Sequence, residues 1–319
     1  MREEFPGSAP VAAISVDLDT LRFYRDIHGL PQRRRRGEDD PAYVVGVRRL
    51  LDLFEACGIR ATLFVIGRDL ESPGHCELLN EATTAGHELA NHTHSHFYDL
   101  RRRHFVDQRE EIVRCEEAIA KIWGRAPVGF RAPGYNIAED LLEVCLERGY
   151  TYDASIFPCP PYYIAKAAVM AWLKLTRRPS RSSMTPVHNL CAPLAPYRPR
   201  LPQYWTSSAR GSGLWEIPVA VVPYLRFPLI GTSLHLLGPG GFDALFGSLR
   251  RAYPDLFNLE FHAIDFMDAT DPGVEDLVSI QPDLAIPWEQ KRRLYTHIFQ
   301  RLRQTYRFAP MCEAVDGLG

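Results

Sequence analysis

Short apolar runs alternate with amphipathic segments at least three times before residue 150, and this alternation constrains the fold more than any other feature. The runs at residues 11–16, 61–66 and 128–130 have the length and composition of buried strands. Segments with helical periodicity follow the runs, and a glycine such as Gly58 ends several of them. Such alternation is typical of a parallel sheet with helices packed outside it, so we predict an α/β fold.

Polar residues stand where the predicted strands end. Asp17 and Asp19 close the first run, His92 and His96 follow a short apolar segment, and Arg131 comes directly after the third run. Ligand sites of parallel α/β folds form at the carboxyl ends of the strands. We therefore expect these side chains to meet at one mouth of the fold.

The residue types in these motifs suit a bound cation. His92 and His96 are four residues apart, so both rings can face one point, and two imidazoles with one carboxylate are a common ligand set for catalytic Zn²⁺. Asp19 is the candidate carboxylate, and Asp17 points to the same face of an extended chain. Each motif alone also occurs as an ordinary helix face or loop. Their combination at successive strand ends favours a metal site.

Length and composition limit the alternatives. The 319 residues suffice for one large α/β domain or two smaller ones, and a net charge of -2 predicts no nucleic-acid partner. Seven cysteines without C-x-x-C spacing predict free thiols in a reducing compartment. The N-terminus shows no signal peptide, and no apolar run is long enough to span a bilayer. These features predict a cytoplasmic protein.

Two segments depart from the alternation. Residues 21–41 are polar and rich in arginine, which predicts a loop near the site. Residues 158–213 are rich in Pro, Ser and Arg, and we interpret them as an insertion over the mouth of one catalytic domain spanning 1–319. Residues 162–178 within it are apolar and then basic. They either pack as a lid on the protein's own surface or form an interfacial helix that contacts a membrane.

Three motifs resemble those of a known family. Residues 86–96 (GHELANHTHSH), 130–135 (FRAPGY) and 259–262 (LEFH) are similar to motifs of the polysaccharide deacetylases, the NodB-homology group of carbohydrate esterase family 4. The resemblance covers about residues 11–153 and resumes near 215–268, and the group includes deformylases of lipid-linked aminosugars. It implies a distorted (β/α) barrel and metal-dependent hydrolysis of an N-acyl group.

The resemblance also implies a role for each motif residue. Asp17 would be the general base and His262 the general acid, and Arg131 would pair with Asp17. The metal ligands would be Asp19, His92 and His96, and a backbone N–H of Gly134 or Tyr135 would help to stabilise the oxyanion. The implied cofactor is one divalent ion, Zn²⁺ first, with Co²⁺, Mn²⁺ and Ni²⁺ also used in the family.

Several functions fit this pattern. The leading hypothesis is hydrolysis of an N-acetyl or N-formyl group from an aminosugar, which could be carried on a nucleotide or on a polyprenyl phosphate. The spacing of Asp17 and Asp19 also resembles relatives that cleave imides, hydantoins or ureides, whereas the histidine at 262 favours the sugar substrate. A barrel that binds without catalysis is the third reading. Glu216 and Asp265 are weak candidates for the partner of His262, and the oligomeric state stays open.

Overall fold

The computed structural model describes residues 9–33, 37–209, 211 and 213–318. The prediction that there is no signal peptide concerns the N-terminal segment, and residues 1–8 of that segment lie outside the described part.

Strand β1 (Val11–Asp17) organises the sheet because parallel strands pair with both of its edges. β9 (Leu256–His262) pairs along its whole length, while β2 (Thr62–Val65) and β10 (Arg307–Phe308) share the other edge. From β2 the sheet continues through β3 (Glu88–Asn91), β4 (Gly129–Phe130), β5 (Tyr152–Asp153) and β6 (Trp215–Glu216). All pairs in this eight-stranded sheet are parallel, which confirms the predicted α/β class.

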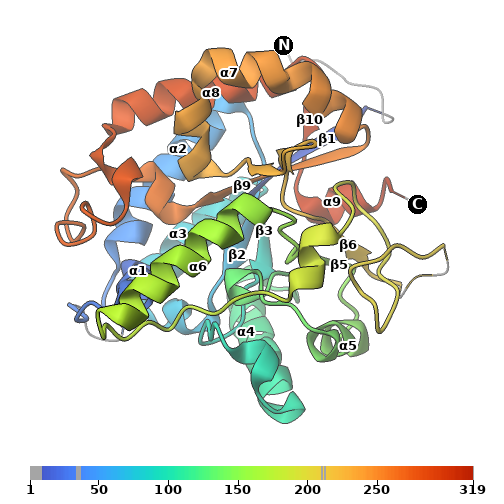
Figure 1. Cartoon of the computed structure of the whole chain (residues 1–319), viewed down its shortest axis with the longest axis horizontal. Helices are drawn as coiled ribbons and strands as arrows, with labels where there is room; N and C mark the ends of the chain where they lie inside the picture. Colours follow the sequence, from blue (N-terminus) through green and yellow to red (C-terminus); the bar gives the residue numbers. More distant parts are fainter. Residues whose placement is uncertain (1–8, 34–36, 210, 212, 319) are drawn as a thin grey trace.

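The sheet curls into a distorted barrel, as the alternation and the family resemblance predict (Figure 1). Beyond β6 the chain turns back towards β9, where the Ala220 N–H donates to the Asn258 carbonyl at 2.9 Å. The short antiparallel hairpin of β7 (Val221–Val222) and β8 (Phe227–Pro228) follows. β6 and β7 are separate strands because the chain leaves the sheet between them.

Helices surround the curled sheet and bury one apolar face each. In α2 (Arg48–Cys57), Leu50 and Phe54 are fully buried, and Gly58 ends the helix in the left-handed conformation at φ 60°. Further helices are α3 (Pro73–Thr84), α4 (Phe105–Trp123), α5 (Glu139–Glu147), α7 (Gly231–Ala252), α8 (Trp288–Arg303) and the short α9 (Met311–Val315). A π-helical turn, η1 (Ala42–Val47), precedes α2.

The loop predicted over residues 21–41 is wrong for its first part. Residues Leu21–His28 form α1, which buries Leu21 and Phe23 against the protein. Arg25 is also buried, and its guanidinium donates to Asp276 at 3.0 Å. Arginine content suggested an exposed loop, but this arginine has a carboxylate partner that only tertiary folding brings close.

The segment 158–213 contains one long helix and little other regular structure. The helix is α6 (Pro160–Leu175), which crosses in front of the sheet (Figure 1). Its residues Tyr162, Val169 and Leu173 line the same cavity as Asp17 and Asp19, so α6 forms a wall over the barrel mouth.

Two further predictions concern cysteines and membrane spans. All seven cysteines are free thiols, as their spacing predicts. Within the part of the chain that the structure describes, none of the helices combines the length and apolar character needed to cross a bilayer.

His87 links the starts of β2 and β3. Its Nδ1 accepts the Ala61 N–H at 3.0 Å, and only 4% of the residue is exposed. Burial, helped by Arg60, lowers the pKa of His87 from 6.5 to about 4. The neutral ring is therefore part of the folded structure.

We predict that His87 makes stability pH-dependent. The unfolded chain protonates this histidine below its ordinary pKa, while the folded protein resists protonation until about pH 4, so stability falls as the pH falls through this window. At about pH 5 the loss is about 2 kcal/mol. His87→Gln should remove that share of the difference in unfolding free energy between about pH 7 and pH 5, measured by urea titration. The exposed His104→Gln should leave the difference unchanged, and equal pH dependence in both variants would contradict the assignment.

Candidate metal and catalytic centre

Parallel register brings the predicted site residues to one edge of the sheet. Asp17 ends β1 and lies opposite His262, which ends β9. Asn91 ends β3 and lies opposite Phe130, which ends β4, so His92 and Arg131 follow at the same level. The strand ends therefore meet as the sequence predicts.

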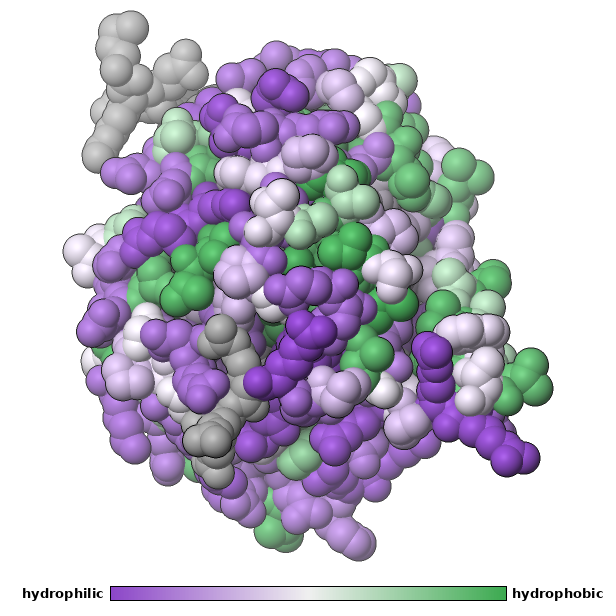
Figure 2. Space-filling model, turned by 90° about the vertical axis from the view of Figure 1, so that its left-hand side faces the viewer, coloured by the Kyte–Doolittle hydropathy of each residue, from purple (hydrophilic) through white to green (hydrophobic). Residues whose placement is uncertain are grey.

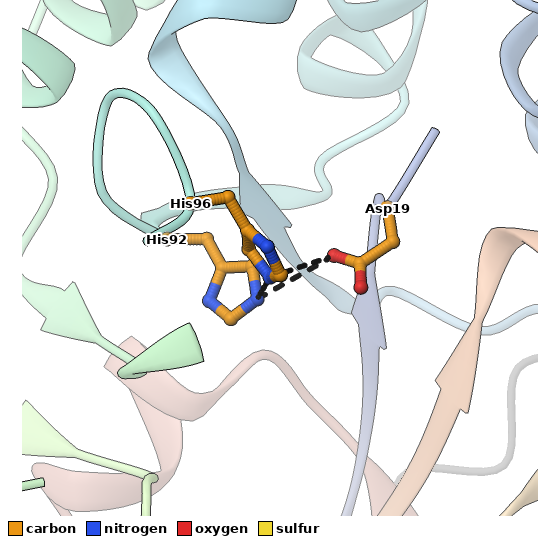
Figure 3. Close-up of side chains that lie close together, drawn as sticks. All are labelled: Asp19, His92 and His96. Carbon is orange, nitrogen blue, oxygen red and sulfur yellow. Dashed lines mark hydrogen bonds and ion pairs between the residues drawn. The ribbon is translucent and has the colours of Figure 1, made fainter. Parts of the chain in front are cut away.

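Asp19, His92 and His96 converge on one point (Figure 3). The two Nε2 atoms are 3.2 Å apart, and the Asp19 Oδ1 atom lies 3.6 Å from that of His92 and 3.3 Å from that of His96. Ligands about 2.1 Å from a tetrahedral ion stand about 3.4 Å from one another. Asp19 Oδ1 is buried and has no hydrogen-bond partner among the described residues. These three residues therefore fit a divalent cation.

The histidine loop is fixed by its own hydrogen bonds. His92 Nδ1 donates to the Arg131 carbonyl at 2.7 Å, which leaves Nε2 facing the centre. Thr93 and His96 have φ values of 64° and 56°, which are left-handed backbone conformations. The conformation is most strained for Thr93, because its side chain is β-branched. The Thr93 N–H donates to the Asn91 side chain, and the His96 N–H to Thr93 Oγ1. The strained turn is what directs both rings inward.

Protonation of the two rings differs. Burial lowers the pKa of His96 to about 4, so this ring is neutral and can offer a nitrogen lone pair to a cation. Burial acts the same way on His92, but Asp17 and Asp19 outweigh it and raise its pKa. Burial also opposes the charge of Asp19, yet His96 and His92 hold its pKa below the usual value. The set carries the unprotonated carboxylate that metal binding requires.

Asp17 is held by the fully buried Arg131. Arg131 Nη1 donates to Asp17 Oδ1 at 2.5 Å, Nη2 donates to Ser15 at 3.0 Å, and Nε donates to the Ala154 carbonyl at 2.9 Å. Burial favours the protonated acid, but Arg131 and then His92 lower the pKa of Asp17 below its ordinary value. Asp17 is therefore ionised, and its other oxygen lies 3.6 Å from His92 Nε2.

Glu260 completes this network and was not identified from the sequence. Arg131 Nη1 also contacts it at 3.2 Å, and the Tyr135 hydroxyl donates to it at 2.8 Å. Burial, helped by Asp17, raises the pKa of Glu260 to about 7 against the opposing effect of Arg131. A signal existed in the sequence: Glu260 and His262 are two residues apart on a strand, so both point to one face.

His262 lines the same cavity as Asp17 and Asp19. Burial would lower its pKa, but Glu260, then the other nearby carboxylates Asp17, Asp19 and Asp265, raise the pKa to about 9. Asp265 accepts the backbone N–H of His262 at 2.8 Å. Glu216 instead accepts the Ile156 N–H, which gives it another role. Among the nearby carboxylates, Glu260 raises the pKa of His262 the most, ahead of Asp265, which was named from the sequence.

Gly134 and Tyr135 also line the cavity. They form a tight turn with φ values of 60° and 62°, and the Tyr135 N–H donates to the Ala132 carbonyl at 3.1 Å. A substrate oxygen would have to compete with that bond for the Tyr135 N–H. One of the two N–H groups of this turn is therefore already engaged.

Several of these groups line a cavity of about 500 Å³, while His96 faces the neighbouring cavity. The floor of the first cavity holds Asp17, Asp19, His92 and His262, and its walls are mostly apolar. The apolar walls are formed by Ile27, Pro161, Ala165, Val169, Met170, Leu173, Leu236 and Ile264.

Comparison with known proteins agrees with the motifs. A family model for polysaccharide deacetylase matches residues 39–152. A peptidoglycan deacetylase from Helicobacter pylori is 30% identical over 165 residues, which are 48% of this chain and 53% of the relative. A peptidoglycan-N-acetylglucosamine deacetylase from Bacillus cereus is 28% identical over 102 residues, 32% of this chain and 36% of the relative. The match thus spans about half or less of these relatives.

Solved structures share the fold at low identity. A Mycobacterium smegmatis protein described as a polysaccharide deacetylase has a TM-score of 0.58 at 18% identity, covering 98% of this chain and 91% of that one. Puue allantoinase has a TM-score of 0.59 at 14% identity with the same coverage. Residues 39–152 of this chain match the polysaccharide deacetylase family, and the chain shares the distorted (β/α) barrel fold of these solved structures.

We predict that purified protein binds one divalent ion through the metal triad, which is Asp19, His92 and His96. His92→Ala should lose most of the bound metal, because two remaining ligands hold a cation weakly. The measurement is metal content after dialysis, with circular dichroism to verify folding. His28→Ala is the matched control, since His28 lines the same cavity outside the triad and should leave metal content unchanged. Full metal retention in His92→Ala would contradict this site.

Proposed function

We propose that this protein is a metal-dependent hydrolase that removes an N-acetyl or N-formyl group from an aminosugar. The carrying observation is that Asp19, His92 and His96 share one point while Asp17 and His262 face the same cavity. The family relationship supports an amide substrate. We further propose that the cation is Zn²⁺, because two imidazoles and one carboxylate suit it; Co²⁺, Mn²⁺ or Ni²⁺ would suit the set too.

The cation would polarise the acyl carbonyl and lower the pKa of a water at the site. Asp17, kept ionised by Arg131, is placed to accept the proton of the attacking water as general base. The turn at Gly134 and Tyr135 would donate an N–H to the developing oxyanion. Arg131 never leaves Asp17 in this scheme. It orients the base and keeps it ionised until it takes the proton from water.

His262 would donate a proton to the departing amine nitrogen. An amide anion is a very poor leaving group, so cleavage requires an acid at this position. The carboxylates around His262 raise its pKa to about 9, so the ring carries the required proton at neutral pH. The same proton source favours the aminosugar over the imide, hydantoin and ureide substrates of the alternative cyclic amidohydrolase.

We predict that Asp17→Asn and His262→Gln each lower kcat/KM for release of amine from an N-acylated aminosugar by roughly 10² to 10⁴-fold. Both should keep their metal, since neither residue belongs to the triad. His297→Gln, on the surface beside Asp243, is the control and should retain full activity.

Full activity of His262→Gln on an imide or ureide would favour the cyclic amidohydrolase and overturn the sugar mechanism. Stoichiometric metal with no turnover of any amide or imide would favour the binding barrel instead.

We also propose that the aminosugar is carried on a lipid, such as a polyprenyl phosphate, and that the protein is cytoplasmic and contacts the membrane peripherally. The support is the outer face of α6, where Ile164 is 70%, Trp172 51% and Leu175 83% exposed. Exposed Lys174, Arg177 and Arg178 follow at its C-terminal end. An apolar face beside a basic cluster is suited to an anionic bilayer surface. In Figure 2, hydrophobic residues (green) lie beside hydrophilic ones (purple) along the right-hand side of the molecule.

We predict that the wild-type protein floats with liposomes that contain anionic lipid and that Trp172→Glu/Leu175→Glu reduces binding by roughly tenfold or more, since each buried side chain of this size contributes about 2 kcal/mol. Val106→Glu is the matched control, because Val106 is 73% exposed on α4. Unchanged partitioning of the double variant would remove the membrane contact from the proposal.

A further inference from the structure

One cationic side chain stands in the apolar wall of the cavity. Tyr162, Lys166, Val169, Met170 and Leu173 follow helical spacing on the inner face of α6, and all line the cavity. Among the lining residues Lys166 is the one Lys or Arg. Its neighbours on this face are apolar or aromatic, so its ammonium group is chemically distinct there.

Lys166 has no carboxylate partner among the residues that the structure describes. Its ammonium lies 5.9 Å from the ring centroids of both Tyr162 and Tyr163, which hold it at the cavity wall. Lys166 is half-buried, and burial lowers its pKa to about 8. The ammonium group is therefore mostly protonated at neutral pH and only partly hydrated. Such a charge gains most from an anion that enters the cavity with the ligand.

The carboxylates on the cavity floor do not serve as that anion. Asp17 is paired with Arg131, Asp19 belongs to the triad, and Asp265 accepts the His262 N–H. The charge of Lys166 is therefore available to the substrate at the cavity wall.

We propose that Lys166 is a specificity-determining residue that pairs with an anionic group, a phosphate ester or a carboxylate, on the acylated aminosugar. This inference rests on the proposed function of the site. It adds that the substrate is negatively charged near the sugar, so neutral oligosaccharides are the poorer substrates.

The test compares three substrates: the neutral methyl glycoside of N-acetylglucosamine, N-acetylglucosamine 1-phosphate, and N-acetylglucosamine with a carboxylate joined to O3 by an ether bond. Wild-type protein should prefer at least one anionic substrate. Lys166→Met should lower kcat/KM for that substrate roughly 10- to 100-fold, mainly through KM, and leave the neutral one unchanged. Lys166→Arg should retain part of the preference. Lys121→Met, at an exposed lysine of α4, is the control and should behave as wild type.

Which anionic substrate loses its advantage identifies the group as phosphate or carboxylate. An equal loss on neutral and anionic substrates, or no preference in the wild type, overturns the role of Lys166. Calorimetric titration with N-acetylglucosamine 1-phosphate and with N-acetylglucosamine separates this outcome from failure of the proposed function. If no substrate is hydrolysed, tighter phosphate binding by wild type than by Lys166→Met still supports the anion site, and equal binding overturns it.

Discussion

The buried guanidinium of Arg131 is the interaction on which the centre depends. It stands between two carboxylates, Asp17 and Glu260, and over the ring of Phe64 at 4.0 Å. Each of these groups would be costly to bury alone, and leaving a buried charge without its partner costs about 3–5 kcal/mol. Because Asp17 and Glu260 belong to β1 and β9 while Arg131 follows β4, the same network fixes strands across the barrel mouth.

This network also divides the carboxylates of the site by chemical state. Arg131 and His92 keep the pKa of Asp17 low, whereas burial and Asp17 raise that of Glu260 to about 7. The negative charge of the cluster in turn raises the pKa of His262. Asp17 is thus ionised and His262 protonated in the same cavity, and such separation of pKa values is what the proposed acid–base catalysis requires.

The cavity wall has a different origin from its floor. The floor consists of strand ends, whose positions follow from sheet register, while α6 and the turns around it supply the walls. Barrels of this class separate stability from specificity in this way, because loops and insertions at the mouth vary without disturbing the core. The apolar and cationic residues of α6 are consequently where the substrate preference of this protein is expected to reside.

The sequence alone determined the alternation of strands and helices, the position of polar motifs at strand ends and the candidate ligands, because these are local patterns of period and spacing. It could not supply the closure near Ala220 and Asn258, the helix at 21–28 or the role of Glu260. Arg25 looked like a loop residue until Asp276, distant in sequence, proved to be its partner. Long-range pairing of buried charges is decided by how the strands assemble, and the tertiary structure alone contains that information.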